Sequence, residues 1–272
     1  MTKENNLYRN SNGSFTKGLN IQLNVTSALI YRELKTRVSE VKFGVLGVFI
    51  EPLGVMIVFL TIFSLLRGRN NTIDIVLFLG SGIVLYTLFN EVAIRSLNAM
   101  KANEALFFYR PVKPIDTVIA RAIVETGLYG IVYLVIIFSV FLLREELILE
   151  DFPLLVVSFL ALALNATGFG LIFMVAGFRY EFLFQIVPLL LRPLWFISGV
   201  FFSLYAVPQR IVPLLSWNPV VQAIELNRYA FTHEYIIDKN VVSLWYLISC
   251  SLITFTIGLF IYTNNEKLLL TR

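Results

Sequence analysis

Charged side chains inside long apolar stretches are the residues of this sequence that could do chemistry. Glu91 and Arg95 lie four residues apart in one stretch. Arg121 and Glu125 repeat that spacing in the next. Ionised groups are costly to bury in hydrocarbon, so such residues usually pair, relay protons or contact a charged substrate. Residues four apart are neighbours on a helix, so we favour pairing within each helix over a proton relay.

Two further charged residues, Glu51 and Arg192, each precede a proline within an apolar stretch. Pairing within one helix does not explain them. For each of them, two interpretations are equally well supported. The side chain faces the helix bundle or lines a cavity, or it has no such role.

Other kinds of chemistry lack the residues they need. No glycine is followed by Lys and then Ser or Thr, so a phosphate-binding loop of that type is missing from the sequence. His233 is the only histidine and Cys250 the only cysteine, which leaves no plausible set of metal ligands and no intramolecular disulfide. We therefore predict no catalytic residue, no metal site and no cofactor in this chain.

The composition is that of an integral membrane protein, because 57% of the 272 residues are hydrophobic and only 15% are charged. A helix needs roughly 20 apolar residues to cross a hydrocarbon core about 30 Å thick. Six stretches meet this length, the fifth of them interrupted at Arg192 and Pro193: 43–66, 75–97, 118–143, 153–178, 182–207 and 245–262. We predict an all-α integral membrane protein with six transmembrane helices.

Lys and Arg are concentrated in the first 42 residues, in the second connection and in the C-terminal tail. The third connection instead carries the acidic run EELILED. The positive-inside rule therefore places both termini in the cytoplasm. The net charge of +4 has the same origin, so we do not expect a nucleic-acid partner.

Two regions outside the six stretches are expected to form shorter elements. Residues 1–24 are polar and are predicted to be a cytosolic tail, with a single transmembrane domain over 25–272. Residues 25–42 carry separate apolar and basic stripes, which predicts an interfacial helix on the inner leaflet, with a solvated helix as the alternative. Residues 208–244 contain three prolines and short apolar runs, which predicts short re-entrant or interfacial helices on the outer side.

The connection 98–117 contains the stretch NEALFFYRPVKPID. Its two prolines end one helix and let another begin, and Asp116 lies in the first turn, where a carboxylate is favoured. Rigid aromatic anchors and available charges follow one another here: Phe107, Phe108, Tyr109, Arg110 and Lys113. From these residues alone, a membrane-surface loop anchored by aromatics is favoured over a docking site for a partner.

Aromatic residues gather in several of the apolar stretches, where most such residues form interface belts or fill helix contacts. A sharper interpretation is that some line a conduit for sugars, whose C–H faces stack on aromatic rings. Charged and aromatic candidates for such a pathway are Glu51, Tyr86, Phe89, Arg192, Trp195, Phe202 and Trp217.

Four segments carry a resemblance to a known family: LFFYRPVKPIDTVIARAIVE (106–125), GFGLIFMVAG (168–177), LLRPLWFISGVFF (190–202) and WNPVVQAIELNR (217–228). With them the sequence resembles the membrane permease of capsular-polysaccharide ABC exporters, of the ABC-2 superfamily. The RPVKPIDT stretch is quite specific, whereas the last segment alone would indicate only the broader superfamily.

The resemblance implies a homodimer that joins two copies of a separate ATPase subunit, which bind ATP and Mg. The complex would export a lipid-linked polysaccharide across the inner membrane of a Gram-negative bacterium, in contact with periplasmic and outer-membrane components. The resemblance also makes the connection 98–117 a coupling region that docks on the ATPase, with Glu104 and Asp116 beside the aromatic and basic residues named above. Outer gate helices would contain Asn218, Pro219, Glu225 and Arg228, of which the last two can pair at helical spacing.

Two other classes of protein stay open. A proton-coupled secondary transporter would use Glu51, Glu91 and Glu125, although no internal repeat is visible. A membrane enzyme acting on lipid-linked sugars would need converging acidic or histidine residues, for which EELILED is the only candidate. For a long acidic polymer we expect Arg192 to contact the substrate, with a neighbouring carboxylate as the alternative partner.

Overall fold

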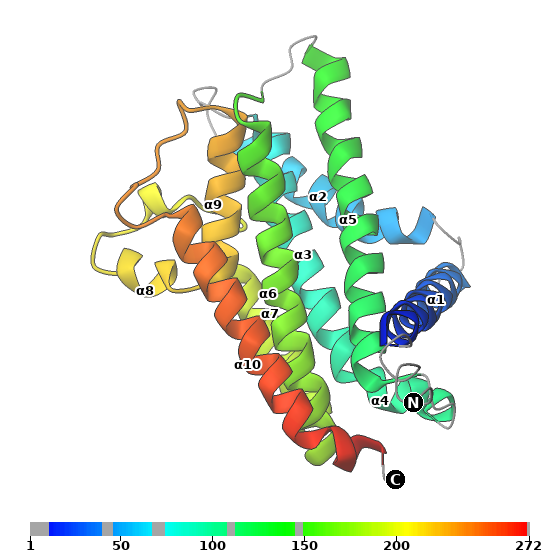
Figure 1. The fold of residues 1–272 in the computed structure, drawn as a ribbon. Helices are drawn as coiled ribbons and strands as arrows, with labels where there is room; N and C mark the ends of the chain where they lie inside the picture. Colours follow the sequence, from blue (N-terminus) through cyan, green and yellow to red (C-terminus); the bar gives the residue numbers. More distant parts are fainter. Residues whose placement is uncertain (1–10, 40–45, 67–73, 108–111, 145–148, 271–272) are drawn as a thin grey trace, which may run out of the picture.

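The computed structural model describes residues 11–39, 46–66, 74–107, 112–144 and 149–270, and every regular element in these ranges is a helix (Figure 1). The described part contains four helices long and apolar enough to cross a membrane: α3 (Ile75–Leu97), α5 (Pro114–Arg144), α6 (Phe152–Arg179) and α10 (Leu244–Leu270). They correspond to four of the six predicted stretches.

Two further apolar helices occupy the other predicted stretches. α2 (Leu46–Leu66) has 21 residues and contains Pro52, whereas α7 (Leu183–Ile197) has only 15. A helix of that length spans about 22 Å, which is less than the roughly 30 Å of a hydrocarbon core. The structure thus supports four spans, and the count of six stays a prediction.

The break in the fifth predicted stretch lies later than expected. Arg192 and Pro193 are inside α7, and the helix ends at Ile197. Gly199 then takes a φ of 74°, a left-handed conformation that glycine adopts without strain. The stretch 182–207 is therefore a helix shorter than a full span followed by a turn, rather than one interrupted helix.

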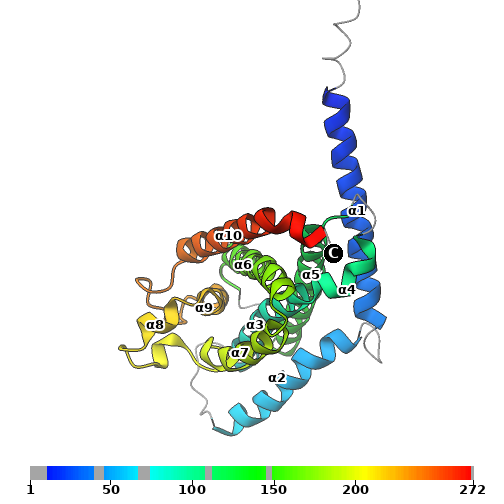
Figure 2. The same cartoon turned by 90° about the horizontal axis from the view of Figure 1, so that it is seen from below.

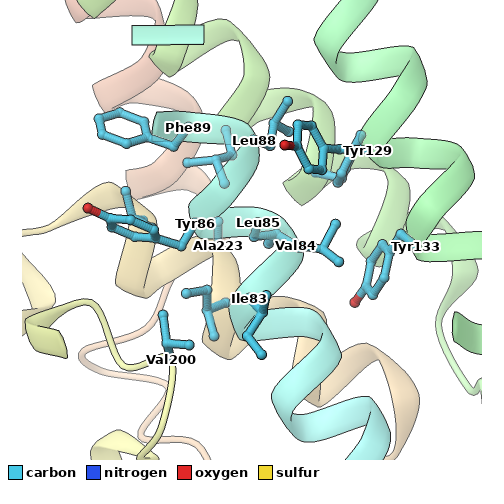
Figure 3. Close-up of a cluster of buried hydrophobic side chains, with 14 of the residues drawn as sticks. Ile83, Val84, Leu85, Tyr86, Leu88, Phe89, Tyr129, Tyr133, Val200 and Ala223 are labelled. Atoms are coloured by element: carbon cyan, nitrogen blue, oxygen red, sulfur yellow. The ribbon is translucent and has the colours of Figure 1, made fainter. Parts of the chain in front are cut away.

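α3 is the central helix of the bundle, with α5, α6 and α7 around it when the molecule is viewed along its axis (Figure 2). Its side chains are buried on more than one side. Tyr86 and Phe89 lie on one side of α3, while Tyr129 and Tyr133 of α5 lie on the other (Figure 3). The part of α3 before Asn90 is buried and almost entirely apolar, as a position in the middle of a bundle requires.

α6 and α10 run side by side along the outside of α3 (Figures 1 and 2). A Cβ atom on Gly168 would lie 2.6 Å from the backbone nitrogen of Phe255, and one on Gly258 would lie 2.6 Å from the carbonyl oxygen of Gly168. The amide of Asn165 also donates to Thr254 Oγ1 at 2.9 Å. Small residues thus let the two helices touch through their backbones, as is common in membrane bundles.

α1 (Ser11–Ser39) lies on the outside of the bundle against α5 (Figures 1 and 2). The helix begins well before residue 25, where the interfacial helix was predicted to start, and residues 40–42 lie outside the described residues. Ile30 packs against Val124 and Leu128 of α5. The apolar stripe of α1 is therefore used at least partly for packing within the chain.

The region 208–244 forms the expected short helices, α8 (Val212–Ser216) and α9 (Pro219–Phe231), after a single turn of 3₁₀ helix, η2 (Leu204–Ala206). α9 packs against α3, α6 and α10 and is buried along most of its length. Its C-terminal carbonyls accept hydrogen bonds from the backbone of Glu150 and Asp151, just before α6. α9 lies toward the end of the bundle opposite the C-terminus (Figure 1).

Candidate functional site

A pocket of about 460 Å³ opens between α2, α3 and α7. Three predicted pathway residues line it: Tyr86, Arg192 and Trp195. Trp195 continues into an aromatic group, with its ring centroid 5.6 Å from that of Phe59 and 4.8 Å from that of Phe201. The pocket is therefore lined by aromatic side chains and a basic side chain, with Trp195 packed edge-to-face against Phe59 and Phe201 beside it.

The polar groups of this pocket differ in whether they are already bonded. The Tyr86 hydroxyl donates to the backbone carbonyl of Leu191, which ties α3 to α7. Thr87 donates to the Ile83 carbonyl at 2.6 Å. Arg192 is exposed and makes no hydrogen bond or ion pair with another residue in the described ranges. Its guanidinium is thus the charged group of the pocket most open to a ligand.

The other predicted pathway residues lie elsewhere or are not described. Phe89 packs edge-on against Phe169 of α6, with centroids 5.7 Å apart. The backbone carbonyl of Phe202 accepts a hydrogen bond from Arg228, and Trp217 is 78% exposed in the segment 208–244. The side chain of Glu51 lies outside the described residues. Sequence reasoning missed Asn90, which lines the pocket and whose signal was an amide among apolar neighbours.

The predicted coupling region contains α4 (Ala99–Asn103) and η1 (Glu104–Leu106) before α5 begins. Glu104 is exposed, and Phe107 is half-buried against the apolar cluster around Met100 and Val118. Phe108, Tyr109 and Arg110 lie outside the described residues. Of the aromatic anchors predicted here, Phe107 therefore serves at least partly to pack within the chain.

Two predicted coupling residues have partners in this chain. Asp116 is only 2% exposed, and its carboxylate accepts from the Lys113 backbone N–H at 2.9 Å and from the Gln22 amide at 2.5 Å. Lys113 Nζ lies 2.9 Å from a carboxylate oxygen of Glu266 near the end of α10. The start of α5 is thus tied to both α1 and α10, although more than half of the Lys113 side chain stays exposed.

The first two predicted gate residues begin α9. The side chain of Asn218 accepts from the Val220 backbone N–H at 2.9 Å, which caps the helix, and Pro219 occupies its first position. The Asn218 amide also donates to Ser198 Oγ at 3.0 Å. The start of α9 is thereby attached to the end of α7.

The other two predicted gate residues form a buried pair, at the helical spacing that the sequence indicated. Arg228 Nη1 lies 3.3 Å from Glu225 Oε1, and both side chains are almost completely buried. The Tyr235 hydroxyl also donates to Glu225 Oε1, at 3.0 Å. A buried ion pair needs such extra hydrogen bonds to offset the loss of hydration.

Arg228 also holds three backbone carbonyls in two segments, α3 and the turn after α7. It donates to the carbonyls of Val200 at 2.8 Å, Phe202 at 2.9 Å and Phe78 at 3.1 Å. Its guanidinium stacks 3.6 Å above the Phe78 ring. Val200 and Phe202 lie in the non-helical segment after α7, so Arg228 supplies hydrogen bonds to carbonyls at the place where the chain turns after Gly199. Arg228, on α9, is thus an anchor for α3 and for the turn after α7.

The two charge pairs predicted within α3 and α5 have different outcomes. Arg95 Nε does lie 3.0 Å from Glu91 on its own helix, as predicted. Arg121 instead contacts Glu33 of α1 at 3.2 Å, and Glu125 contacts Arg95 at 3.0 Å. The ion pairs therefore join helices, which spacing along one helix could not reveal.

The described helices are those of an integral membrane protein with a pocket between α2, α3 and α7. Residues 24–232 match the ABC-2 type transporter family, and the chain belongs to this family. It is 38% identical over 255 residues to the polysialic acid transport protein KpsM of Escherichia coli, covering 93% of this chain and 98% of that protein.

More distant relatives carry similar descriptions. The capsule polysaccharide export inner-membrane protein CtrC of Neisseria meningitidis is 26% identical, over 93% of this chain and 96% of that protein. The protein BexB of Haemophilus influenzae, described in the same words, is 24% identical over the same shares. This chain is therefore similar along nearly its whole length to inner-membrane export proteins.

Proposed function

We propose that this chain is the transmembrane subunit of an ATP-driven exporter that moves lipid-linked capsular polysaccharide across the bacterial inner membrane. The observation that carries this proposal is the 38% identity, over 93% of the chain, to a polysialic acid transport protein. The shared family and the spanning helices agree with it. The polymer would move by conformational gating, with no catalytic step in this chain.

The working unit in this proposal is a homodimer of six-span subunits with both termini in the cytoplasm. α2 and α7 would supply the first and fifth spans and line the passage between the two subunits. Exposed apolar residues support this role for both helices: Ile57, Val58 and Ile62 on α2, and Leu189, Leu190 and Phe196 on α7. α8 and α9 would lie on the outer side and gate the passage, in contact with periplasmic and outer-membrane export components.

Energy would come from two copies of a separate ATPase subunit, which would hold ATP and Mg, since the sequence has no phosphate-binding loop of its own. The coupling region 98–117 is the proposed contact. Glu104 is exposed there, and Lys113 is exposed over more than half of its side chain. A proton-driven alternative is less well supported, because Glu91 and Glu125 are both engaged in ion pairs.

Co-purification tests the coupling region. The tagged chain, extracted gently from native membranes, is expected to bring an ATPase subunit with it. The triple change Tyr109→Ala, Arg110→Ala and Lys113→Ala should remove most of that ATPase, because it deletes an aromatic anchor and two charges. The control is Lys239→Ala, on the outer region. A chain that purifies without an ATPase under all conditions would contradict the proposed function.

The pocket between α2, α3 and α7 is the proposed place where the polymer touches this subunit. Trp195 offers an aromatic face for a sugar ring, and Arg192 offers a charge for an acidic group. We expect Arg192→Gln to lower export of an acidic polymer by about tenfold, the effect of losing one charged contact. Surface polymer is measured at equal amounts of folded protein. The control is Arg210→Gln, at an exposed arginine outside the pocket. Normal export by Arg192→Gln would contradict the proposed contact between Arg192 and the substrate.

A further inference from the structure

Six charged residues form one cluster between α1, α3 and α5. Each helix contributes one glutamate and one arginine four residues apart: Glu33 and Arg37, Glu91 and Arg95, Arg121 and Glu125. The cluster is therefore neutral overall. The two α1 residues have the same four-residue spacing as the pairs in α3 and α5. This repeated spacing is the feature of the sequence that could have indicated the cluster.

Most contacts in this cluster run between helices. Arg37 of α1 lies 3.2 Å from Glu91 and 3.3 Å from Glu125. Glu33 of α1 lies 3.2 Å from Arg121 and 3.6 Å from Arg95. The two α1 residues thus reach all four partners on α3 and α5.

Burial makes these contacts costly to break from one side. Glu125 is fully buried, and the side chains of the other five are at most 17% exposed. Removing one member of a buried charge set leaves an unpaired charge, whereas removing a neutral pair does not. Ion pairs of this kind also fix one register between helices, because a shifted register would separate the charges.

The same helix holds the coupling region through two further bonds. The Gln22 amide donates to Asp116 at the start of α5, at 2.5 Å. Arg32 donates to Asn103 at the end of α4, also at 2.5 Å. α1 is therefore bonded to the region 98–117 at Asn103 and at Asp116. It is also bonded to α3 and α5 through the charge cluster.

We propose that the charge cluster is a mechanical joint that makes α1, α3 and α5 move together when the coupling region is displaced. The six residues are positioning residues, because none of them needs to touch polymer or ATP. The joint would transmit a displacement of the coupling region directly to α3, which lines the pocket together with α2 and α7. The displacement would then not be absorbed by bending of the connection 98–117. This inference rests on the proposed function, since it assumes an ATPase that displaces the coupling region.

The test uses the chain reconstituted in vesicles with its ATPase partner. The double change Glu33→Gln and Arg37→Gln removes the α1 charges and leaves two arginines and two glutamates on α3 and α5. We expect complex assembly and basal ATP hydrolysis within about twofold of the unchanged protein, and polymer export lowered about tenfold, within the range of coupling mutations. Tyr31→Gln, an exposed change on α1, is the control.

A cross-link separates a mechanical role from a merely structural one. Ile30→Cys and Val124→Cys place thiols on packed residues of α1 and α5, in a background with Cys250→Ser. In the double-glutamine protein, a short thiol cross-linker is expected to restore the ratio of polymer exported to ATP hydrolysed to at least about half its original value, because a covalent link replaces the lost ion pairs.

Three results would overturn the joint. They are normal export by the double-glutamine protein, a parallel loss of export and ATP hydrolysis, and no recovery of their ratio after cross-linking. If the double-glutamine protein does not accumulate, a charge exchange, Glu33→Arg with Arg121→Glu, is tested instead. A higher ratio of polymer exported to ATP hydrolysed in the exchange than in Glu33→Arg alone supports the joint. Equally low ratios in the two proteins oppose it. Unchanged protein without polymer-dependent ATP turnover would instead contradict the proposed function.

Discussion

Replacing Arg228 with leucine is expected to prevent this protein from accumulating in the membrane. The guanidinium holds the carbonyls of Phe78, Val200 and Phe202 and neutralises the buried carboxylate of Glu225. Leucine would leave that carboxylate without its counter-charge and would remove the hydrogen bonds from Arg228 to all three carbonyls. Breaking a buried ion pair from one side costs about 3–5 kcal/mol, a large part of the stability of a typical domain.

The amount of folded protein and its thermal stability in detergent measure this effect. Arg210→Leu, at an exposed arginine in the segment that precedes α8, is the matched control and should change neither. Adding Glu225→Met to Arg228→Leu removes both charges, so part of the stability should return. Normal accumulation of Arg228→Leu would show that Arg228 does not anchor α9 and the turn after α7.

Adding one methyl group at Gly168 is expected to separate α6 from α10. The new Cβ would lie 2.6 Å from the Phe255 nitrogen and 2.7 Å from the Thr254 carbonyl carbon. Both are backbone atoms, so no side chain can rotate away and a helix must shift. Such overpacking typically costs about 1–3 kcal/mol, and Gly258→Ala should act in the same way because it meets the Gly168 carbonyl.

Gly127→Ala provides the matched control, because nothing lies within 4 Å of a Cβ placed there on α5. That change should leave stability unchanged or raise it slightly, since alanine favours helix more than glycine does. Thermal unfolding of the three alanine variants in the same detergent gives the comparison. Equal midpoints for Gly168→Ala and Gly127→Ala would mean that the two helices do not need this close contact.

Several helices could be located from the sequence because apolar length is a local property. The stretch 75–97 has the same bounds as α3, and those of α6 differ by one residue at each end from 153–178. The end of α7 could not be located in this way. It depends on Gly199 together with hydrogen bonds from Arg228, which lies on another helix.

The candidate site shows the same division. Charged and aromatic residues in apolar stretches marked Tyr86, Arg192 and Trp195, which do meet in one pocket. Phe89 is also aromatic and lies only three residues after Tyr86 in the sequence, yet its side chain packs against α6. Residue type alone does not distinguish them, because the direction of a side chain depends on which helices surround α3.

The sequence by itself determined the class of this protein: an all-α membrane protein of the ABC-2 type without a nucleotide-binding loop, with short helices near its C-terminal third. Composition and apolar length are enough for the membrane class, because each is read within a single stretch of chain, and the ABC-2 type follows from the resemblance of four segments to that family. Only the tertiary structure decided which charges pair. Arg37 and Glu125 lie 88 positions apart in the chain and 3.3 Å apart in space. Electrostatic partners are chosen by distance through space and by burial, and both arise only when the helices pack.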